Sequence, residues 1–333
     1  MKTISSKRIL ITGGTGSFGT YILKELTKIN NSKEIIVFSR DEDRQFNLKR
    51  QYSNYNNIKF EIGDVRDLQR LREVCKGIDI IFNAAALKQV PNNEFNPYEA
   101  ILTNIIGAKN IVTASIENNV EKIIGISTDK AVKPVNAMGM TKALQEKLFT
   151  AESTNRNDTK FCCVRYGNVI GSRGSVIPFF KELILRDEKL PITHSEMTRF
   201  LITLKEAIDL VMFAVANLRG GEIFVKKSPS CEITMLAEVM YNILKSKQKD
   251  SKKSLYYIAG KRPGEKIHEI LISEDEGTNR VDDKRNYYIV NPFWKNPTYP
   301  EIKEYSSNPA TITSHKELEE LLKTADNLSW KEI

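Results

Sequence analysis

The sequence has 333 residues, of which 41% are hydrophobic and 28% are charged, and its net charge is +8. These values are typical of a soluble globular protein, and no apolar run approaches the roughly 20 residues that cross a membrane. The first strand pattern begins too early for a signal peptide, so we expect a cytoplasmic protein without a membrane partner. Basic residues alternate with acidic ones, and the densest basic stretch, 245–253, is short, so we expect no nucleic-acid partner.

Cysteine and histidine usage argues against disulfide and metal chemistry. The four cysteines form no C-x-x-C pair, and the three histidines lie far apart in the chain. We therefore expect reduced, buried thiols and no metal site.

Apolar, strand-like runs alternate with helical patterns over the first 170 residues. The expected strands are 8–12, 34–39, 58–63, 78–83, 122–127 and 161–165, and helices are expected between them at 16–29, 68–75 and 97–118. This alternation predicts an α/β protein with a Rossmann-type, doubly wound parallel sheet that is covered by helices on both faces.

Beyond residue 170 the pattern breaks into Gly- and Pro-containing loops, a few helices and short strands, and it ends in a helix near 315–326. We predict a dinucleotide-binding Rossmann domain over 1–170, which also carries the catalytic residues. Residues 171–333 are predicted to form mainly a smaller, substrate-binding C-terminal lobe and an extension. Such a lobe would close over the carboxyl edge of the sheet, where ligands bind in open α/β sheets.

A glycine-rich turn follows the first strand and opens the first helix. Gly13, Gly16 and Gly19 allow a tight turn, the approach of backbone N–H groups to a pyrophosphate, and close packing of the helix on the sheet. The strand–turn–helix context makes this a strong indication of a dinucleotide site. The intervening residues belong to the same predicted site: Thr15, Ser17 and Phe18.

The end of the second strand bears on which dinucleotide binds. An NAD site usually has an acidic residue there, whereas this chain has Ser39 and Arg40, and a guanidinium suits a 2′-phosphate. We therefore predict NADP, with NAD as the less favoured cofactor. The alternative for Arg40 is a surface ion pair with Asp41 or Glu42.

Two further strand ends complete the predicted cofactor site. Asp64 and Val65 follow the third strand and are placed to touch the adenine. Ala84 and Ala85 follow the fourth strand, where small side chains would line the path to the nicotinamide.

The fifth strand leads into the segment where a short-chain dehydrogenase/reductase would show Ser…Tyr-x-x-x-Lys. Lys142 has the right spacing, but Met138 stands at the tyrosine position, and a thioether cannot give or take a proton. Either the chain is catalytically dead, or Asp129 and Lys130 carry the acid–base chemistry. Lys142 can still bond the ribose of the cofactor.

The helix that carries Lys142 has a predicted core face. At about 100° per residue, one apolar stripe forms on this helix, and Met138 and Lys142 lie together on a different flank. The stripe consists of Ala137, Met140, Leu144 and Leu148.

Ser-Thr-Asp-Lys-Ala at 127–131, followed by Pro-x-Asn-x-x-Gly-x-x-Lys at 134–142, resembles the UDP-N-acetylglucosamine 4,6-dehydratase family of extended short-chain dehydrogenases/reductases. The resemblance covers roughly residues 5–275. Met138 and Gln89 place the chain nearer a subgroup with Met at the tyrosine position, which serves capsule, polysaccharide and glycan synthesis. The further matching motifs are 85–91, 165–169, 172–178, 197–200 and 262–266.

The resemblance implies a redox-neutral lyase reaction that yields a 4-keto-6-deoxy sugar, with or without inversion at C5. The 4-hydroxyl is oxidised, water is eliminated across C5–C6, and tightly bound NADP is recycled. By resemblance, Lys130 is the base at C5, Asp129 the acid for the 6-hydroxyl, and Thr128 orients the 4-hydroxyl. We expect nearby cations, Lys142 and the oxidised nicotinamide, to lower the pKa of Lys130, and burial to raise that of Asp129. The proton on O4 would leave through Asp129, a water or the cofactor ribose.

Residues mostly from the second half of the chain are expected to bind a nucleotide sugar, with UDP-GlcNAc as the leading substrate. Three arginines fall in the matching motifs and suit phosphate oxygens. Lys88 and Asn168 would reach the sugar or diphosphate, and Glu265 would accept from ribose hydroxyls or pin an arginine. The other predicted substrate residues are Arg173, Val176, Arg199 and Arg262.

Alternatives stay open at this point. A nucleotide-sugar 4-epimerase or ketoreductase would use the same fold, and GDP-GlcNAc would be an alternative substrate. A non-catalytic NADP- or nucleic-acid-binding protein is a more distant alternative, suggested by Met138 and the positive charge. We also expect a homo-oligomer, either a dimer or a hexamer.

Overall fold

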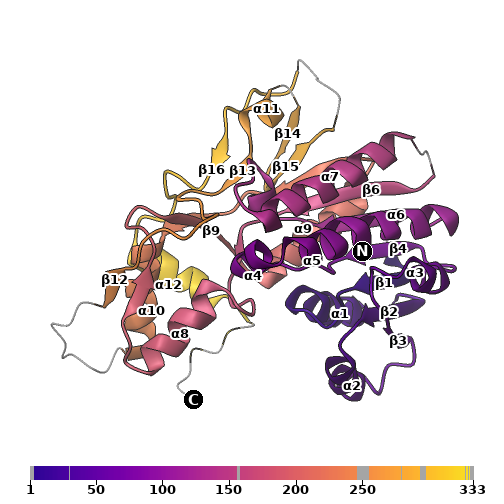
Figure 1. The fold of residues 1–333 in the computed structure, drawn as a ribbon, viewed down its shortest axis with the longest axis horizontal. Coiled ribbons are helices and arrows are strands. Elements are labelled where there is room, and N and C mark those ends of the chain that lie inside the picture. The colour runs from indigo at the N-terminus through magenta and orange to yellow at the C-terminus, as the bar shows by residue number, and fades with distance from the viewer. Residues whose placement is uncertain are drawn as a thin grey trace.

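The computed structural model describes residues 4–29, 31–155, 158–245, 255–278, 280–292, 298–326, 328 and 330. Apart from Lys245, the basic stretch noted in the sequence lies outside these residues. Figure 1 shows a large sheet-and-helix body and a smaller lobe beside it, which is built from later parts of the chain.

The large sheet confirms the predicted Rossmann-type topology. Its first six strands stand in the spatial order 3-2-1-4-5-6 and all run parallel. This is the order of a doubly wound dinucleotide-binding sheet. Expected and observed strand ends differ by at most two residues, the observed strands being β1 (Arg8–Thr12), β2 (Glu34–Ser39), β3 (Ile58–Ile62), β4 (Ile80–Asn83), β5 (Lys122–Ile126) and β6 (Lys160–Arg165).

Helices cover both faces of this sheet, each over its own apolar core. Side chains from the first group of helices pack in one core cluster with the sheet, and those from the second group pack in another. The first group is α1 (Ser17–Ile29) and α9 (Leu204–Asn217), and the second is α3 (Leu68–Val74), α6 (Gly107–Glu117) and α7 (Ala137–Asn155). The short helix α2 (Glu42–Gln51) lies against β3.

Later parts of the chain extend the same sheet. β10 (Ile223–Lys226) pairs parallel with β6, and the antiparallel hairpin of β14 (Val281–Lys284) and β15 (Tyr287–Val290) continues the sheet beyond it. Segments on both sides of residue 170 therefore share one sheet. The division at that residue stays a prediction.

The smaller lobe has a core of its own. Its helices are α8 (Val176–Leu185), α10 (Ile233–Lys245) and α12 (His315–Lys323), which pack around a third apolar cluster. Three short sheets complete the structure: β7 (Asn168–Val169), β9 (Thr198–Ile202) and β11 (Ser230–Glu232) form one, β8 (Leu190–Ile192) and β12 (Tyr256–Ile258) another, and β13 (Ile270–Ile272) and β16 (Tyr305–Ser306) a third. The first of them joins the lobe to the large body, because β9 has side chains in the core of each. The short helix α11 (Glu274–Gly277) follows β13.

The single helix expected over 97–118 is divided into three parts. After α4 (Val90–Phe95) come α5 (Pro97–Ala100), a π-helical stretch η2 (Ile101–Ile106) and α6. Asn104 of η2 accepts from the backbone N–H of Leu87 and donates to its carbonyl and to the hydroxyl of Thr141. This side chain fixes the loop that follows β4, and a π-helical turn is often found where a side chain must be placed in this way.

The predicted core face of α7 is wrong. Met140 and Leu144 are about half exposed, whereas Met138 is 4% and Lys142 5% exposed. Met138 and Lys142 do share a face, as predicted, but that face is the buried one. Hydrophobic periodicity missed it because polar side chains occupy most of it and find partners inside the protein: Thr141, Lys142, Gln145 and Glu146.

All four cysteines are buried and free, which confirms the expected state of the thiols. Burial raises the pKa of Cys75 to about 12. Within the described ranges, no helix combines the length and the apolar character needed to cross a bilayer.

Candidate active site

The glycine-rich turn lies directly on the loop that follows β4. Gly13 has a φ of +63°, and a Cβ there would lie 2.8 Å from the backbone of Ala84 and Ala85. Only glycine fits this position, because any other residue would be strained and would clash. Two predicted cofactor segments are therefore in contact, and the open cradle between strand and helix fits a dinucleotide pyrophosphate.

The two residues predicted to discriminate between NAD and NADP, Ser39 and Arg40, both contact other side chains of the protein. The Ser39 hydroxyl is buried, 3.2 Å from the Thr15 hydroxyl and 3.1 Å from Nε2 of Gln45. The exposed Arg40 guanidinium pairs with Asp64 at 3.2 Å, and not with Asp41 or Glu42, the partners considered in the alternative interpretation.

The remaining predicted cofactor residues surround this cradle. Asp64 also accepts from the backbone N–H of Arg66, and Val65 is buried against the start of α6. Phe18 packs against the core under α1. The Ser17 hydroxyl faces the Arg173 backbone N–H at 3.5 Å.

Lys142 is held at the end of β5. Its ammonium donates to the Ile126 carbonyl at 2.7 Å and to Oε1 of Gln145 at 2.9 Å. No carboxylate among the described residues forms an ion pair with it, and burial lowers the pKa of Lys142 to about 8. The neighbouring Ser127 hydroxyl is not free for chemistry, because it donates to Glu146 at 2.6 Å.

Asp129 and Lys130 stand on a 3₁₀ turn, η3 (Asp129–Ala131), immediately after β5. The Lys130 ammonium lies 3.0 Å from Oδ1 of Asp129, and the Thr128 hydroxyl donates to the same oxygen at 2.8 Å. Thr128, predicted to orient the 4-hydroxyl, is therefore engaged by Asp129. The turn rests on Gly139 of α7, where a Cβ would clash with the Lys130 carbonyl.

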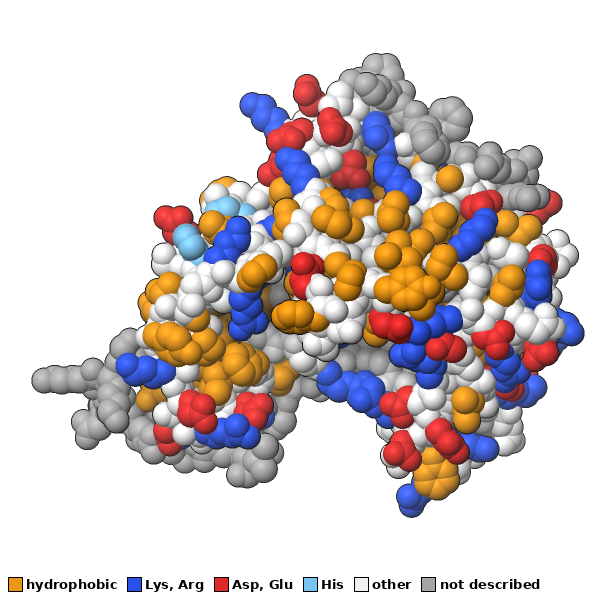
Figure 2. Space-filling model, viewed as in Figure 1, with side chains coloured by type: hydrophobic (Ala, Val, Ile, Leu, Met, Phe, Trp, Pro, Cys, Tyr) orange, Lys and Arg blue, Asp and Glu red, His pale blue; other side chains and the backbone are white. Residues whose placement is uncertain are grey.

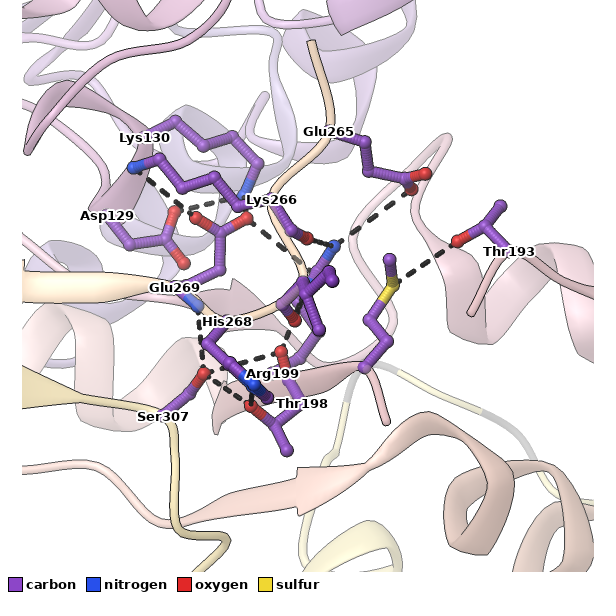
Figure 3. Close-up of polar contacts among 12 residues, drawn as sticks. Asp129, Lys130, Thr193, Thr198, Arg199, Glu265, Lys266, His268, Glu269 and Ser307 are labelled. Carbon is purple, nitrogen blue, oxygen red and sulfur yellow. Dashed lines mark hydrogen bonds and ion pairs between the residues drawn. The ribbon is translucent and has the colours of Figure 1, made fainter. Parts of the chain in front are cut away.

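A carboxylate that the sequence analysis missed completes this cluster (Figure 3). Glu269 reaches Lys130 from the loop before β13, with Oε1 3.1 Å from the ammonium. Arg199 of β9 lies 3.7 Å from the same oxygen, and Lys266 lies 3.9 Å from Oε2. Glu269 follows Lys266 by three positions, so the only sequence signal was a carboxylate just beyond a matching motif.

The direction of the pKa shift predicted from the sequence is confirmed for Asp129 and wrong for Lys130. Burial raises the pKa of Asp129, as predicted. Burial alone would lower the pKa of Lys130, but the carboxylates of Asp129 and Glu269 outweigh it and raise that pKa. The expected lowering is therefore wrong for the protein by itself, and the cation that opposes the rise is Arg199, not Lys142.

A cavity of about 720 Å³ opens beside Lys130, between the large sheet and the smaller lobe. Its wall includes most of the residues predicted to bind substrate: Lys88, Asn168, Val176, Arg199, Arg262 and Glu265. Oδ1 of Asn168 is buried without a hydrogen-bond partner among the described residues. An unsatisfied buried acceptor of this kind suits a ligand donor.

Two of the predicted phosphate-binding arginines are used within the protein. Arg199 is 6% exposed and donates to the carbonyls of Thr198, Lys266 and Ile267. Arg173 is not in the cavity wall, because its guanidinium donates to the Thr15 carbonyl of the glycine-rich turn at 2.8 Å. Arg173 therefore lies on the cofactor side, while its substrate role stays a prediction.

Lys88 and Asn136 connect the cavity to its surroundings. Lys88 donates to the Arg173 carbonyl at 3.0 Å, and burial, followed by the charge of Arg173, lowers the pKa of Lys88. Asn136 accepts from the Gly139 N–H and donates to the Gly264 carbonyl, each at 2.7 Å. It thus ties the start of α7 to the loop that carries Arg262. Among the described residues, no cluster of His, Cys, Asp and Glu suits a metal ion.

Comparison with known proteins places this geometry in a family. A family model described as "Polysaccharide biosynthesis protein" matches residues 9–292. A protein of Rickettsia typhi named UDP-glucose 4-epimerase is 44% identical over 336 aligned residues, which cover 96% of each chain.

Two solved structures are similar to this one. Pen from Bacillus thuringiensis superimposes with a TM-score of 0.89 at 35% identity, covering 98% of this chain and 99% of Pen. DesIV, a dTDP-glucose 4,6-dehydratase from Streptomyces venezuelae solved with NAD and TYD, shares the fold with a TM-score of 0.70 at 19% identity, covering 78% and 86%. The chain therefore belongs to the polysaccharide biosynthesis protein family and is an enzyme of the nucleotide-sugar dehydratase/epimerase type, built on the extended short-chain dehydrogenase/reductase fold.

Proposed function

We propose that this enzyme is an NADP-dependent nucleotide-sugar 4,6-dehydratase that acts on UDP-GlcNAc and serves surface-glycan synthesis. The observation that carries the proposal is the ion pair of buried Asp129 and part-buried Lys130, which lies in the wall of the cavity. Exchange of configuration at C4 needs only oxidation and reduction at that carbon. Elimination of water across C5–C6 needs, in addition, a base and an acid side by side, which this pair supplies.

The two side chains suit opposite roles. The raised pKa of Asp129, caused by burial, favours a carboxylic acid that can protonate the departing 6-hydroxyl. Lys130 would take the proton from C5 in its neutral form, which becomes accessible when Asp129 is a neutral acid and no longer holds the ammonium by its charge. Because their side chains lie 3.0 Å apart, the proton on Lys130 can return to Asp129 after water has left. When hydride returns to C6, C5 takes a proton from solvent, which balances the proton released from O4. A nicotinamide dinucleotide bound at the glycine-rich turn would supply the reversible redox chemistry at C4 and C6.

Met138 is consistent with this division of roles. It stands on the buried face of α7 beside Lys142, and its side chain cannot transfer a proton. The demanding proton transfers, at C5 and O6, are assigned to Asp129 and Lys130. The O4 proton is left to Asp129, a water or the cofactor ribose.

A 4-epimerase is the second candidate, because the Rickettsia relatives carry the name UDP-glucose 4-epimerase. The two reactions leave different marks on the sugar. A dehydratase produces a 4-keto-6-deoxy sugar with solvent hydrogen at C5. An epimerase returns the 4-epimer with its C5 hydrogen unchanged.

NMR of UDP-GlcNAc incubated with the NADP-loaded enzyme in D2O separates the two candidates. We expect a new C6 methyl signal, a hydrated 4-keto carbon and deuterium at C5, and the C5 configuration will show retention or inversion. Formation of UDP-GalNAc without deuterium would establish the epimerase instead. Parallel incubations with UDP-glucose and GDP-GlcNAc test the sugar and the nucleotide. The cytoplasmic location stays a prediction.

The enzyme is also proposed to be a homo-oligomer, on the evidence of an uncovered apolar face. Figure 2 shows apolar side chains gathered over α5 and α7. The exposed members of this face are Phe95, Tyr98, Ile101, Ile106, Met140 and Leu144, of which Phe95 is 85% exposed. Exposed apolar patches of this kind are uncommon on monomers. Light scattering should give a mass above 38.0 kDa for the native chain and a monomer for a Tyr98→Glu/Leu144→Glu variant, whereas a monomeric native chain would contradict the proposal.

A further inference from the structure

Glu269 has no part in the chemistry described so far, although its buried carboxylate contacts Lys130, as that of Asp129 does. Its side chain is 2% exposed, and its Oε2 has no hydrogen-bond partner among the described residues. A carboxylate is costly to bury. Its neighbours offset that cost, because the charges of Lys130, Arg199 and Lys266 keep the pKa of Glu269 below its ordinary value despite burial.

The backbone of Glu269 is fixed by the C-terminal part of the chain. Its N–H donates to the Ser307 hydroxyl at 2.9 Å, and its carbonyl accepts from the Ser307 N–H at 2.8 Å. The Ser307 hydroxyl is in turn 2.7 Å from that of Thr198. The Glu269 carboxylate therefore projects from a rigid support, which Figure 3 shows beneath it.

Geometry at the Lys130 nitrogen gives this carboxylate a role. An amine nitrogen has four substituent positions, of which carbon takes one. Contacts to Asp129 at 3.0 Å and to Glu269 at 3.1 Å occupy two more. The last position has no partner among the described residues, and Lys130 lies in the cavity wall. When Lys130 is neutral, two N–H bonds to the two carboxylates leave the lone pair in that last position.

We propose that Glu269 is the positioning residue for Lys130: its carboxylate orients the amine so that the lone pair faces the cavity and Asp129 stays within reach. This inference rests on the proposed dehydratase function. The proton that Lys130 takes from C5 passes to Asp129, which has given its own proton to the departing hydroxyl, so both groups return to their starting states. Without Glu269, the flexible lysine side chain would swing around the single Asp129 contact.

Glu269→Gln tests the role, since it keeps the shape and removes the charge. We expect kcat to fall about 100-fold, as is typical when a reacting group is misplaced. KM should change little, because the anionic substrate loses no cationic partner. The matched control is Glu274→Gln on α11, whose carboxylate pairs with the exposed Lys133 at 2.8 Å and should leave kcat unchanged.

The pH profile supplies a readout that a merely structural role would not move. The charged groups that face Glu269 are Asp129 and Lys130 from η3, Arg199 from β9 and Lys266 from its own loop, while His268 is turned to Thr198. Removal of one negative charge beside Lys130 favours its neutral form. The acidic limb of kcat in Glu269→Gln should therefore move to lower pH, and native kcat with an unmoved limb would overturn the proposal.

Two further measurements keep the test decisive. Glu269→Asp retains the charge but is one methylene shorter, so its limb should stay in place while kcat falls; native kcat in this variant would show that position does not matter. Lysine labelled with ¹³C at Cε reports the Lys130 titration by NMR without any substrate, with Lys130→Ala for assignment. A pKa of Lys130 that does not fall in Glu269→Gln would refute the contact, whereas failure of the native enzyme to form a 4-keto-6-deoxy sugar would refute only the proposed function.

Discussion

Lys142 and Lys130 stand in two parts of the molecule that are built in different ways. Lys142 is held by the β5 carbonyl of Ile126 and by Gln145 of its own helix, and it forms no ion pair within the part of the chain that the structure describes. Lys130 lies between Asp129 and Glu269, and Glu269 comes from a distant part of the chain. The pKa of Lys142 is lowered, with burial as the main cause, and that of Lys130 is raised. The first region is assembled from two neighbouring elements, β5 and α7, and the second requires a carboxylate that lies 139 positions further along the chain.

The largest effect is expected from a substitution that disrupts the Lys130 site and leaves the Lys142 site intact. Lys130→Ala should lower the rate of the proposed elimination by about 1000-fold, since it removes the residue proposed as the general base, while bound cofactor is retained. NMR of the product measures the loss of elimination, and the absorbance of the bound cofactor shows whether the cofactor is retained. Loss of the cofactor from this variant would contradict the separation of the regions and give Lys130 a structural role.

The second prediction sharpens the account of Lys142. In the folded protein Lys142 loses its proton near pH 8, whereas in the unfolded chain it keeps it until about 10.5. The unfolded state therefore binds more protons between these values, and the native protein gains stability as the pH rises through them. Relative to Lys142→Met, the native chain should gain about 3 kcal/mol from pH 7 to 10.5.

Urea unfolding at a series of pH values measures this gap. Lys147→Met, on the exposed side of α7, is the matched control and should show no such dependence. Parallel stability curves for the native protein and Lys142→Met would mean that Lys142 is not an uncompensated buried cation.

The third prediction concerns the contact between the two regions at Gly139. Gly139→Ala places a methyl group against the Lys130 carbonyl, and overpacking of this kind costs about 2 kcal/mol. We expect a lower free energy of unfolding together with a lower kcat, because the η3 turn must shift. Lys147→Ala on the same helix should alter neither. A stable Gly139→Ala variant with native kcat would show that η3 yields without consequence.

The smallest expected effect lies on the cofactor side. Arg40 is exposed, and its pairing with Asp64 is a surface ion pair of little energetic value. It is therefore free to turn to a 2′-phosphate, and Arg40→Ala should reduce the preference for NADP over NAD by about tenfold, the worth of one charged hydrogen bond. Dissociation constants for both cofactors, measured by calorimetry, decide this. An unchanged ratio would remove Arg40 from the specificity site.

The locally built region could be predicted from the sequence. Each part of this region is marked by a short motif next to a predicted strand. The glycine-rich turn follows β1, Ser39 ends β2, Asp64 follows β3, and Lys142 lies on the helix that comes after β5. The alternation of strands and helices predicted the doubly wound parallel sheet, and most of the predicted cofactor residues stand near the carboxyl end of a strand. The order of the strands came from the structure.

The site around Lys130 could not be predicted to the same extent. Glu269 is separated from Lys130 by most of the second half of the chain. Contacts of its loop with β16, Ser307 and Arg199 bring it there. The direction of the Lys130 pKa depends on that unseen carboxylate. Hydrophobic periodicity failed to predict the buried face of α7 for a related reason. Thr141, Lys142 and Glu146 are buried because their polar groups bond to partners on other elements.

The hydrogen bonds between Ser307 and Glu269 have a consequence for the order in which the enzyme is completed during synthesis. The cofactor cradle lies in the first part of the chain and leaves the ribosome early, whereas the support of Glu269 is among the last segments to emerge. A nascent or prematurely terminated chain would thus contain the glycine-rich turn and Lys130 while the Ser307 support of Glu269 was still missing. Such a fragment would bind cofactor without converting the sugar, and catalytic activity would begin only after the segment around Ser307 had been added.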